Sequence, residues 1–291
     1  MRCARDGPYS DAVLETRDKI ALARLFSRPL VSARRAFGLG AVVRVRRGGV
    51  NWHLDLDEGI DFSIWLLGAF ERSVARAFRR FVRPGMTVLD VGANVGAHTL
   101  PLARLVGASG RVVAIEPTDW AFAKLCANVA ENPSLAPRVS SIQALLLGRD
   151  DDAAPDSICS SWPLAPAADL HPKLRGRSMA VSGAQATSLD TLLSRAGVER
   201  VDFVKVDVDG YEGQVLRGAR ETLRRHRPAL LIELAPYLLS EHGDSLDAVL
   251  ALLDEAGYAL HSLRSDVALG AAEVRRQLEG AEAVNFLARA A

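Results

Sequence analysis

Glycine and acidic residues with spacings suited to chemistry gather at two places in the sequence. The first is Asp90-Val91-Gly92-Ala93-Asn94-Val95-Gly96, between an apolar run and a stretch with helical spacing. Glycines in a strand-to-helix turn let the backbone approach a ligand, and the helix start offers free N–H groups. A dinucleotide site prefers G-x-G-x-x-G, but Asn94 and Ala97 occupy the second and third glycine positions. The turn therefore disfavours a nicotinamide-dependent oxidoreductase, which we keep as an alternative.

The same turn suits a ligand with a carboxylate and an ammonium group but no phosphate. The methionine part of S-adenosylmethionine is such a ligand, and Asp90 is placed to receive its ammonium directly or through water. Gly92, Asn94 and Gly96 complete the cofactor contacts expected at this turn. Glu116 ends the next apolar run, 26 residues after Asp90, where an acidic residue grips ribose in related half-sheets. A carboxylate accepts two hydroxyl hydrogen bonds, so Glu116 suits the ribose diol.

The second place is the apolar run that leads into Lys205-Val206-Asp207-Val208-Asp209-Gly210-Tyr211-Glu212. Alternate residues of a strand share a face, so Lys205 and Asp207 are expected to point the same way. A lysine in an apolar strand needs a charged partner, because its desolvation is costly. Asp207, Asp209 and Glu212 would lie at the carboxyl edge of a sheet, where open α/β proteins bind ligands. They are candidate catalytic acids; a structural ion pair with helix-capping acids is the alternative.

Alternating strands and helices from residue 86 onward would position both clusters. Apolar strands alternating with amphipathic helices indicate a parallel sheet covered on both faces. We expect a helical and β-hairpin extension over residues 1–82 and a cofactor-binding domain over 83–291. Residues 149–181 interrupt the alternation with three consecutive aspartates and four prolines, which predicts an irregular insertion and a lid.

The individual elements follow from hydrophobic periodicity and from turn residues. In the extension we predict helices over 11–37, interrupted at Pro29, and over 64–81, with hairpin strands over 42–45 and 50–56. In the domain we predict helices over 97–106, 120–131, 189–196, 211–226 and 245–256. Strands are predicted over 87–91, 111–116, 139–146, 201–207, 229–234, 258–263 and 283–288. The third of these strands would place the backbone at Ala144 beside adenine.

Composition excludes several classes of protein. The 291 residues carry 36 basic and 35 acidic side chains, a formal net charge of +1, which gives no general attraction to nucleic acid. The three cysteines are far apart and suggest neither a disulfide framework nor a CxxC metal site. No apolar run approaches the roughly 20 residues that span a bilayer, and no secretory signal is visible. We therefore expect a cytoplasmic protein without a membrane span, and the oligomeric state stays open.

Several segments together resemble the FkbM-type S-adenosylmethionine-dependent methyltransferase family. The resemblance runs from about Gly68 to Leu287 and includes GAFE, PGMTVLDVGANVGAHT, VVAIEP, TSLDTLL, VDFVKVDVDGYEGQVLRGARETL, RPALLIEL and VNFLA. It implies a Rossmann-like class I α/β fold with a seven-stranded, mostly parallel sheet whose last strand is antiparallel. It also implies methyl transfer to a hydroxyl of a sugar, polyketide or similar metabolite, so the partner would be a small-molecule or glycan acceptor.

The resemblance also assigns roles to residues. The cofactor contacts carried over are Asp90, Gly92, Gly96 and Glu116, and the signature of the active edge is Glu71, Lys205, Asp207, Asp209 and Glu212. We add Asn94, Ala144 and Asp207 to the expected cofactor contacts. Asp209 stands where the family usually has Glu. The Asp side chain is one methylene shorter, which departs from the family pattern.

An alcohol is a poor nucleophile at neutral pH, so methyl transfer to a hydroxyl calls for a base. Asp207 and Asp209 are the first candidates, with Glu71 and His98 behind them; for His98 we favour a packing or cofactor-contact role. A divalent cation such as Mg²⁺, held by Asp207 and Glu233, is an alternative that the sequence does not favour.

A nucleic-acid-binding or nucleic-acid-modifying protein is a further alternative. Its best support is two basic clusters, Arg44/Arg46/Arg47 and 224–227. Both clusters also fit simpler interpretations, as one face of a hairpin strand and as cations at a helix C-terminus. We therefore expect no nucleic-acid partner.

Overall fold

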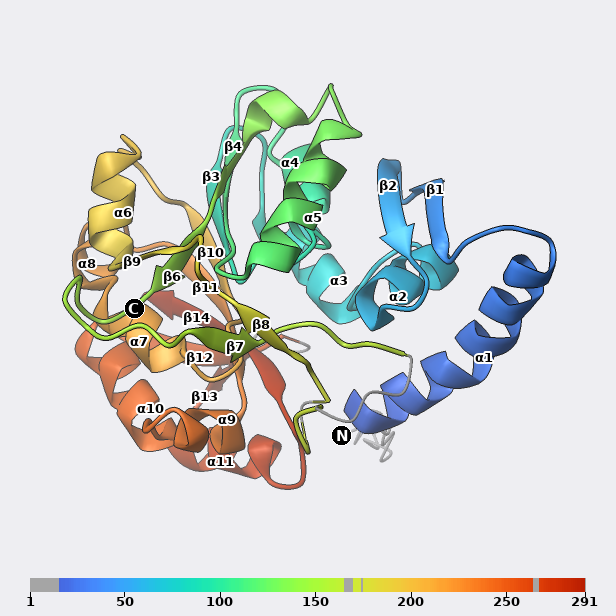
Figure 1. Ribbon diagram of the computed structural model, residues 1–291. Coiled ribbons are helices and arrows are strands. Elements are labelled where there is room, and N and C mark those ends of the chain that lie inside the picture. Colours follow the sequence, from blue (N-terminus) through green and yellow to red (C-terminus); the bar gives the residue numbers. More distant parts are fainter. Residues whose placement is uncertain (1–15, 165–169, 174, 264–266, 291) are drawn as a thin grey trace, which may run out of the picture.

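Helices cover both faces of an eight-stranded sheet in this computed structural model (Figure 1). The structure describes residues 16–164, 170–173, 175–263 and 267–290. The strands of the large sheet, in chain order, are β3 (Thr87–Val91), β4 (Arg111–Ile115), β5 (Val139–Ile142), β10 (Phe203–Val206), β11 (Ala229–Leu234), β12 (Tyr258–Ser262), β13 (Ala268–Leu269) and β14 (Val284–Ala290).

The order of the strands across the sheet is β13-β12-β14-β11-β10-β3-β4-β5. The chain first builds the sheet from β3 toward β5 and then, from β10 on, in the other direction. The order therefore reverses between β3 and β10, where open α/β sheets bind ligands beyond the carboxyl ends of the strands. β14 runs antiparallel between β11 and β12. The predicted seven strands with an antiparallel last member are confirmed, and the two-residue β13 is an addition at the edge.

Alternate residues of the central strands feed two separate hydrophobic cores. Leu89 and Val91 face one core, which is covered by helices of the second half of the chain. Val88 faces the other core. The helices of the first face are α6 (Leu189–Arg195), α7 (Glu212–Arg217), α8 (Arg220–His226), α9 (Pro236–Glu241), α10 (Leu246–Glu255) and α11 (Ala271–Leu278). The helices of the second face are α3 (Arg72–Phe81), α4 (Thr99–Leu105) and α5 (Asp119–Ala130).

The extension before β3 packs into the core of the second face. It comprises α1 (Thr16–Ala36), the hairpin β1 (Val42–Arg47) and β2 (Val50–Asp55), and α2 (Gly59–Leu67). Val50, Trp52 and Leu54 alternate along β2 and are buried together with residues of β3 and α4, as a half-buried strand requires. α1 continues through Pro29, so the predicted interruption there is wrong.

Three predicted elements are each divided in two. The helix predicted over 64–81 is divided into α2 and α3 by the turn at 68–71. The helix predicted over 211–226 is divided at Gly218, where an added Cβ would lie 2.2 Å from the Leu147 carbonyl oxygen, so the two backbones touch. The strand predicted over 139–146 leaves the large sheet at Gln143, and β6 (Ala144–Leu146) pairs instead with β9 (Gln185–Thr187).

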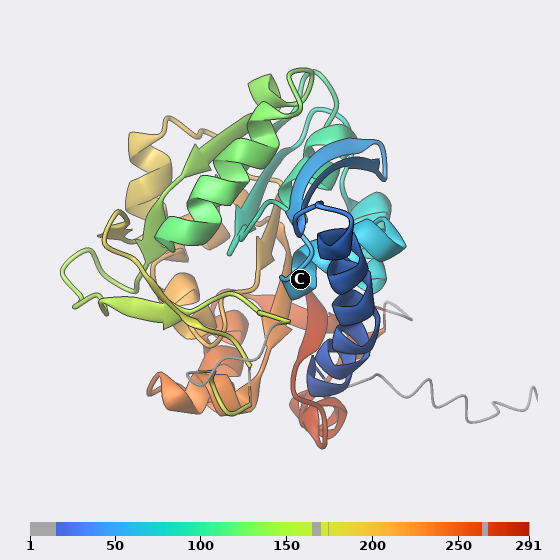
Figure 2. The same cartoon turned by 45° about the vertical axis from the view of Figure 1, so that its right-hand side comes forward.

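The insertion over 149–181 contains more regular structure than predicted. β7 (Ser157–Cys159) and β8 (Ser178–Ala180) form an antiparallel pair, and Figure 2 shows this pair passing in front of the carboxyl edge of the sheet. The segment after β7 then joins the extension, because the Gly59 N–H donates to the Trp162 carbonyl at 2.8 Å. Residues 165–169 and 174 of the insertion lie outside the described residues.

Among the helices that the structure describes, none is long and apolar enough to cross a bilayer.

Candidate active site

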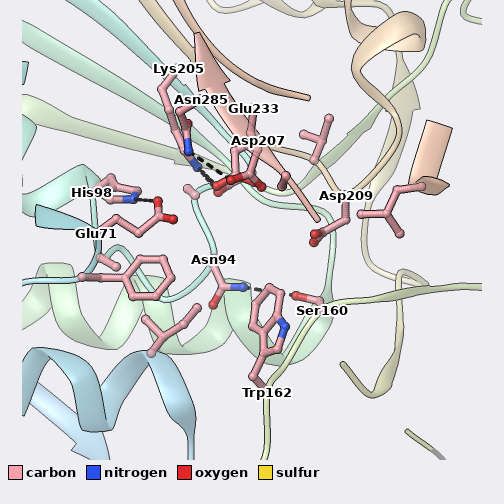
Figure 3. A pocket seen from close by; sticks show the side chains of 18 of the residues that line it. Glu71, Asn94, His98, Ser160, Trp162, Lys205, Asp207, Asp209, Glu233 and Asn285 are labelled. Carbon is pink, nitrogen blue, oxygen red and sulfur yellow. Dashed lines mark hydrogen bonds and ion pairs between the residues drawn. The ribbon is translucent and has the colours of Figure 1, made fainter. Parts of the chain in front are cut away.

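A cavity of about 1070 Å³ opens at the carboxyl edge of the sheet, where the strand order reverses. The ends of β3 and β10, the turn at 68–71, the insertion and the C-terminal segment all contribute to its lining. Figure 3 shows the polar side chains that converge on it. The candidate residues that line it are Glu71, Gly92, Asn94, His98, Glu116, Ala144, Lys205, Asp207, Asp209 and Glu233.

The turn after β3 is pressed against the end of β10. Gly92 has φ +76°, and an added Cβ would lie 1.8 Å from the Asp207 carbonyl oxygen. A side chain at this position is therefore excluded by the protein itself. The sequence indicated a glycine that makes room for a ligand; the structure adds that this glycine lets the two ligand-facing strand ends meet.

Glu116, at the end of β4, holds the cofactor turn in place. Its Oε2 accepts the Asn94 N–H at 2.9 Å, and its Oε1 accepts the Thr118 N–H at 2.9 Å and the Thr118 hydroxyl at 2.5 Å. Burial raises the pKa of this carboxyl, and it outweighs the three hydrogen-bond donors, which lower the pKa. A carboxylate offers about four acceptor sites, so about one remains. The ribose contact of Glu116 stays a prediction, with about one acceptor site left for it.

Asn94 connects the turn to the insertion. It adopts a left-handed backbone conformation with φ +47°, which Asn tolerates better than most residues. Its Oδ1 accepts the Val95 N–H at 2.8 Å, and its Nδ2 lies 3.3 Å from the Ser160 hydroxyl oxygen. The cofactor turn and the insertion therefore share a side-chain contact at the cavity wall.

Lys205 is the cation at the centre of the site. It is only 2% exposed, and its Nζ donates to the Gly92 carbonyl at 2.9 Å. The same Nζ lies 3.1 Å from the Asp207 carboxylate and 3.6 Å from Asp90, which pairs directly with Lys205 across the β10–β3 register. Burial disfavours the charged ammonium, but the negative charges of Asp207 and Asp90 outweigh it, and the pKa of Lys205 is raised.

Asp207 is held ionised by this arrangement. Burial opposes its charge, but the Lys205 ammonium outweighs burial and lowers the pKa of Asp207, and a hydrogen bond with Glu233 adds to the effect. The pairing of Lys205 with Leu231 in the β10–β11 register, continued by two residues, places Asp207 beside Glu233. The predicted shared face of Lys205 and Asp207 is confirmed by their 3.1 Å contact.

Glu233 completes the carboxylate pair and was not among the predicted catalytic residues. Its Oε1 accepts the Asn285 side-chain N–H at 3.0 Å, and the two residues are direct partners across the antiparallel β11–β14 register. Burial and the charge of Asp207 raise the pKa of Glu233 well above its ordinary value. Within the pair, Asp207 therefore loses its proton at a lower pH than Glu233 does. The sequence signal that would have found it is an acid at the end of β11 opposite an amide on β14.

The two acids after Asp207 have different surroundings. Asp209 lines the cavity in a left-handed conformation with φ +49°, and burial together with the charge of Asp207 raises its pKa well above the ordinary value. Glu212 is buried outside the cavity lining. Its Oε1 accepts the N–H groups of Val208 and Gly210 at 3.3 Å, so Glu212 holds the turn that precedes α7 and does not bond N–H groups of the helix itself.

Glu71 and His98 form the wall opposite the carboxylate pair. Glu71 precedes α3 with φ +44°, and its Oε2 lies 3.4 Å from the His98 Nε2. His98 is 4% exposed and lies between Phe70 and Phe78, with ring centroids 5.7 and 5.3 Å away. These contacts agree with the packing role favoured for His98, and they bring Glu71 to the cavity.

Two predicted cofactor contacts do not reach the cavity. Asp90 is fully buried behind the turn, where its Oδ2 accepts the Thr99 hydroxyl at 2.6 Å. Gly96 faces α5, with an added Cβ 3.0 Å from the Leu125 side chain. Neither residue is part of the described lining. Asp90 therefore acts on the cavity through Lys205, and Gly96 serves the packing of the turn against α5.

Comparison with known families identifies the chain. Residues 90–260 match the Methyltransferase FkbM domain, which is more than half of the sequence. The chain belongs to the FkbM methyltransferase family. The match covers the turn after β3, Glu116 and the whole β10–β11 edge, and it makes the chain an S-adenosylmethionine-dependent methyltransferase. This assignment removes the nicotinamide alternative.

Solved methyltransferase structures show distant likeness to the chain. An FkbM methyltransferase from Methylobacillus flagellatus KT is 17% identical, with 88% of this chain and 65% of that chain covered and a TM-score of 0.42. A TehB-like SAM-dependent methyltransferase from Corynebacterium glutamicum is 10% identical, with 79% of this chain and 94% of that chain covered and a TM-score of 0.44. TYW2 of M. jannaschii in complex with AdoMet is 13% identical, with 85% of this chain and 84% of that chain covered and a TM-score of 0.41. No curated protein matches the chain.

The described residues contain no group of three or more His, Cys, Asp or Glu side chains arranged to hold a metal ion. At the position considered for Mg²⁺, between Asp207 and Glu233, the Lys205 ammonium already lies 3.1 Å from Asp207.

Proposed function

We propose that this FkbM-family enzyme transfers the methyl group of S-adenosylmethionine to a hydroxyl group of a sugar, polyketide or similar small metabolite or glycan. The observation that carries the proposal is the ionised Asp207, held by Lys205 in the same cavity as the turn at 92–94. Because Asp207 already pairs with Lys205, its carboxylate is not needed to neutralise the ammonium group of the cofactor. It is therefore available to the proton of an incoming hydroxyl.

The residues of the cavity fit the cofactor. Glu116 keeps about one acceptor site for a ribose hydroxyl, the backbone at 92–94 is bare of large side chains, and Ala144 offers a small side chain beside the adenine position. When bound, S-adenosylmethionine supplies a methyl group on a positively charged sulfur. The cavity walls around the cofactor and the acceptor then contribute mainly by aligning the acceptor oxygen with that methyl group.

Asp207 takes the hydroxyl proton in this proposal. Lys205 keeps it ionised, while Glu233, fixed by Asn285, donates a hydrogen bond to it and so holds its orientation. The same partners make Asp207 a weak base, so proton removal is expected to accompany bond formation rather than to precede it. Asp209 and Glu71 line the cavity as further acids and are proposed to contact the polar part of the acceptor.

The proposal assigns the acceptor to small molecules and glycans rather than to nucleic acid. Of the basic clusters, Arg44 pairs with Glu131 at 2.9 Å, Arg47 donates to the Trp65 carbonyl, and Arg224 pairs with Glu221 at 2.8 Å. Neither cluster lines the cavity. Inside it, the side chains facing an acceptor are carboxylates, which repel a phosphate backbone.

Incubation of the purified enzyme with methyl-labelled S-adenosylmethionine and a metabolite extract of its own organism tests the proposal. Mass spectrometry should find label on the oxygen of one small hydroxyl compound, with or without a metal chelator. Label only on nucleic acid or on nitrogen or carbon atoms would contradict the proposal, and loss of labelling with chelator would restore the Mg²⁺ alternative. The expected cytoplasmic location stays a prediction.

A further inference from the structure

The outer part of the cavity is built from apolar side chains that the proposed methyl transfer does not use. Phe26 of α1, Leu66 and Leu67 of α2, and Phe70 line it, and we call these four residues the apolar wall. Phe26, Leu66 and Leu67 remain 53%, 52% and 50% exposed. Large apolar side chains that line one cavity and stay exposed mark a binding site, because leaving them in water is costly.

The apolar wall leads directly into the reacting edge. Leu67 and Glu71 are four positions apart in the chain, so their Cα atoms are at most about 14 Å apart. Phe70 contacts His98, with ring centroids 5.7 Å apart, and His98 lies 3.4 Å from Glu71. The wall and the carboxylates are therefore two ends of one cavity rather than separate features.

The apolar wall has firm support beneath it. Phe62 of α2 is 2% exposed and packs with Val31 of α1, Leu56 and Leu164 in a small core of its own. Leu164 belongs to the insertion, and its N–H donates to the Asp57 carbonyl at 2.7 Å. The helices that carry Phe26, Leu66 and Leu67 are therefore joined to each other and to the insertion by a packed core beside the cavity.

We propose that the acceptor is amphipathic, with a hydroxyl-bearing polar end at Asp207 and an extended apolar portion that lies along the apolar wall. The position of the hydroxyl rests on the proposed function; the apolar portion rests on the wall. At about 1070 Å³ the cavity exceeds the usual range of about 300–1,000 Å³ for a single ligand site, so it has room for both cofactor and acceptor. Charge at the inner end and apolar side chains at the outer end match the two parts of such a molecule.

A series of linear alcohols tests the proposal by direct binding, without turnover. Calorimetry with 1-hexanol, 1-octanol and 1-decanol, added to protein saturated with S-adenosylhomocysteine, should show about fourfold tighter binding for each added methylene. Phe26→Ser and Leu66→Ser should each weaken 1-decanol binding about fivefold to tenfold. Phe37→Ser is the matched control, because Phe37 is 84% exposed but lies outside the cavity lining. It should bind 1-decanol within twofold of wild type.

Two results would overturn the proposal. One is alcohol affinity that does not depend on chain length; the other is an equal loss in Phe37→Ser and Phe26→Ser. Sedimentation with phosphatidylcholine vesicles is a further test. If Phe37→Ser and Phe26→Ser weakened vesicle binding equally, Phe37 and Phe26 would belong to a membrane-binding surface instead. Failure of wild-type protein to bind S-adenosylhomocysteine would contradict the proposed function, while the alcohol series alone would still decide the role of the wall.

Discussion

The Nζ of Lys205 lies 3.1 Å from the carboxylate of Asp207, two residues farther along the same chain. The same atom donates to the Gly92 carbonyl and lies 3.6 Å from Asp90. One buried cation therefore connects the cofactor turn to the reacting edge. Methyl transfer removes the positive charge of the cofactor sulfur, and in the proposed reaction the hydroxyl proton neutralises Asp207 at the same time, so the net charge of the site does not change.

Removing this cation should destabilise the fold. Lys205→Met leaves Asp207 and the fully buried Asp90 without their counter-charge, which costs about 3–5 kcal/mol when one partner of a buried pair is lost. Urea unfolding of both proteins measures the difference. Arg224→Met, which breaks an exposed pair with Glu221, is the control and should change the stability far less than Lys205→Met does. Similar losses in the two variants would show that the Lys205 pair is no more than a surface-like contact.

Glu116 should contribute to cofactor affinity. Glu116→Ala removes the remaining acceptor site for ribose and releases the Asn94 N–H, so S-adenosylhomocysteine binding should weaken by on the order of 1–3 kcal/mol. Calorimetry checks this, with Glu221→Ala as an exposed control that should bind like wild type. Unchanged affinity in Glu116→Ala would end the ribose assignment.

Glu212 should make stability depend on pH. Burial raises its pKa from 4.5 to about 7 in the folded protein, so the folded state keeps a proton that the unfolded state releases. Its contribution to stability is therefore full below about pH 4.5 and is lost as the pH rises to about 7. Glu212→Gln cannot ionise and should avoid this loss. Relative to wild type it should gain on the order of 2–3 kcal/mol between pH 4.5 and pH 8.

Urea unfolding of wild type and Glu212→Gln at both pH values measures this gain. Glu221→Gln, at the surface of α8, should show no comparable gain between the two pH values. A difference between Glu212→Gln and wild type that is the same at pH 4.5 and at pH 8 would contradict the raised pKa of Glu212.

The insertion is predicted to act as a lid over the acceptor. Limited proteolysis should cut first within 149–181, and bound cofactor together with acceptor should protect it. Asn94→Ala removes the contact with Ser160 and should speed cutting in the presence of S-adenosylhomocysteine. Cutting at equal rates in every state and in both proteins would leave a surface loop with no lid function.

Much of the fold follows from periodicity and turn residues in the sequence. The parallel strands and the shared face of Lys205 and Asp207 depend on local alternation, which a single sequence displays. The antiparallel direction of β14 was expected from the family resemblance alone. Asp90 illustrates the limit, because its sequence neighbours do not reveal that Lys205 stands opposite it in the β10–β3 register. The contact through Lys205 depends on strand order, which local pattern does not contain.

The missed pair of Glu233 and Asn285 has the same cause. The two residues are 52 positions apart, and only the antiparallel register of β11 and β14 makes them partners. The divided strand at Gln143 and the divided helix at Gly218 likewise reflect contacts with distant backbone, such as the Leu147 carbonyl. Tertiary contacts overrode local propensity at these positions.

Asp207→Asn tests the central claim most directly, because it keeps the shape of the side chain and removes the base. Turnover with methyl-labelled S-adenosylmethionine and the identified acceptor should fall about 10²–10⁴-fold, while affinity for S-adenosylhomocysteine stays within a few-fold. Asp209→Asn, measured in parallel, should retain more turnover, and circular dichroism should show both variants folded. Turnover that survives in Asp207→Asn while cofactor affinity collapses would contradict the account and make Asp207 a cofactor ligand.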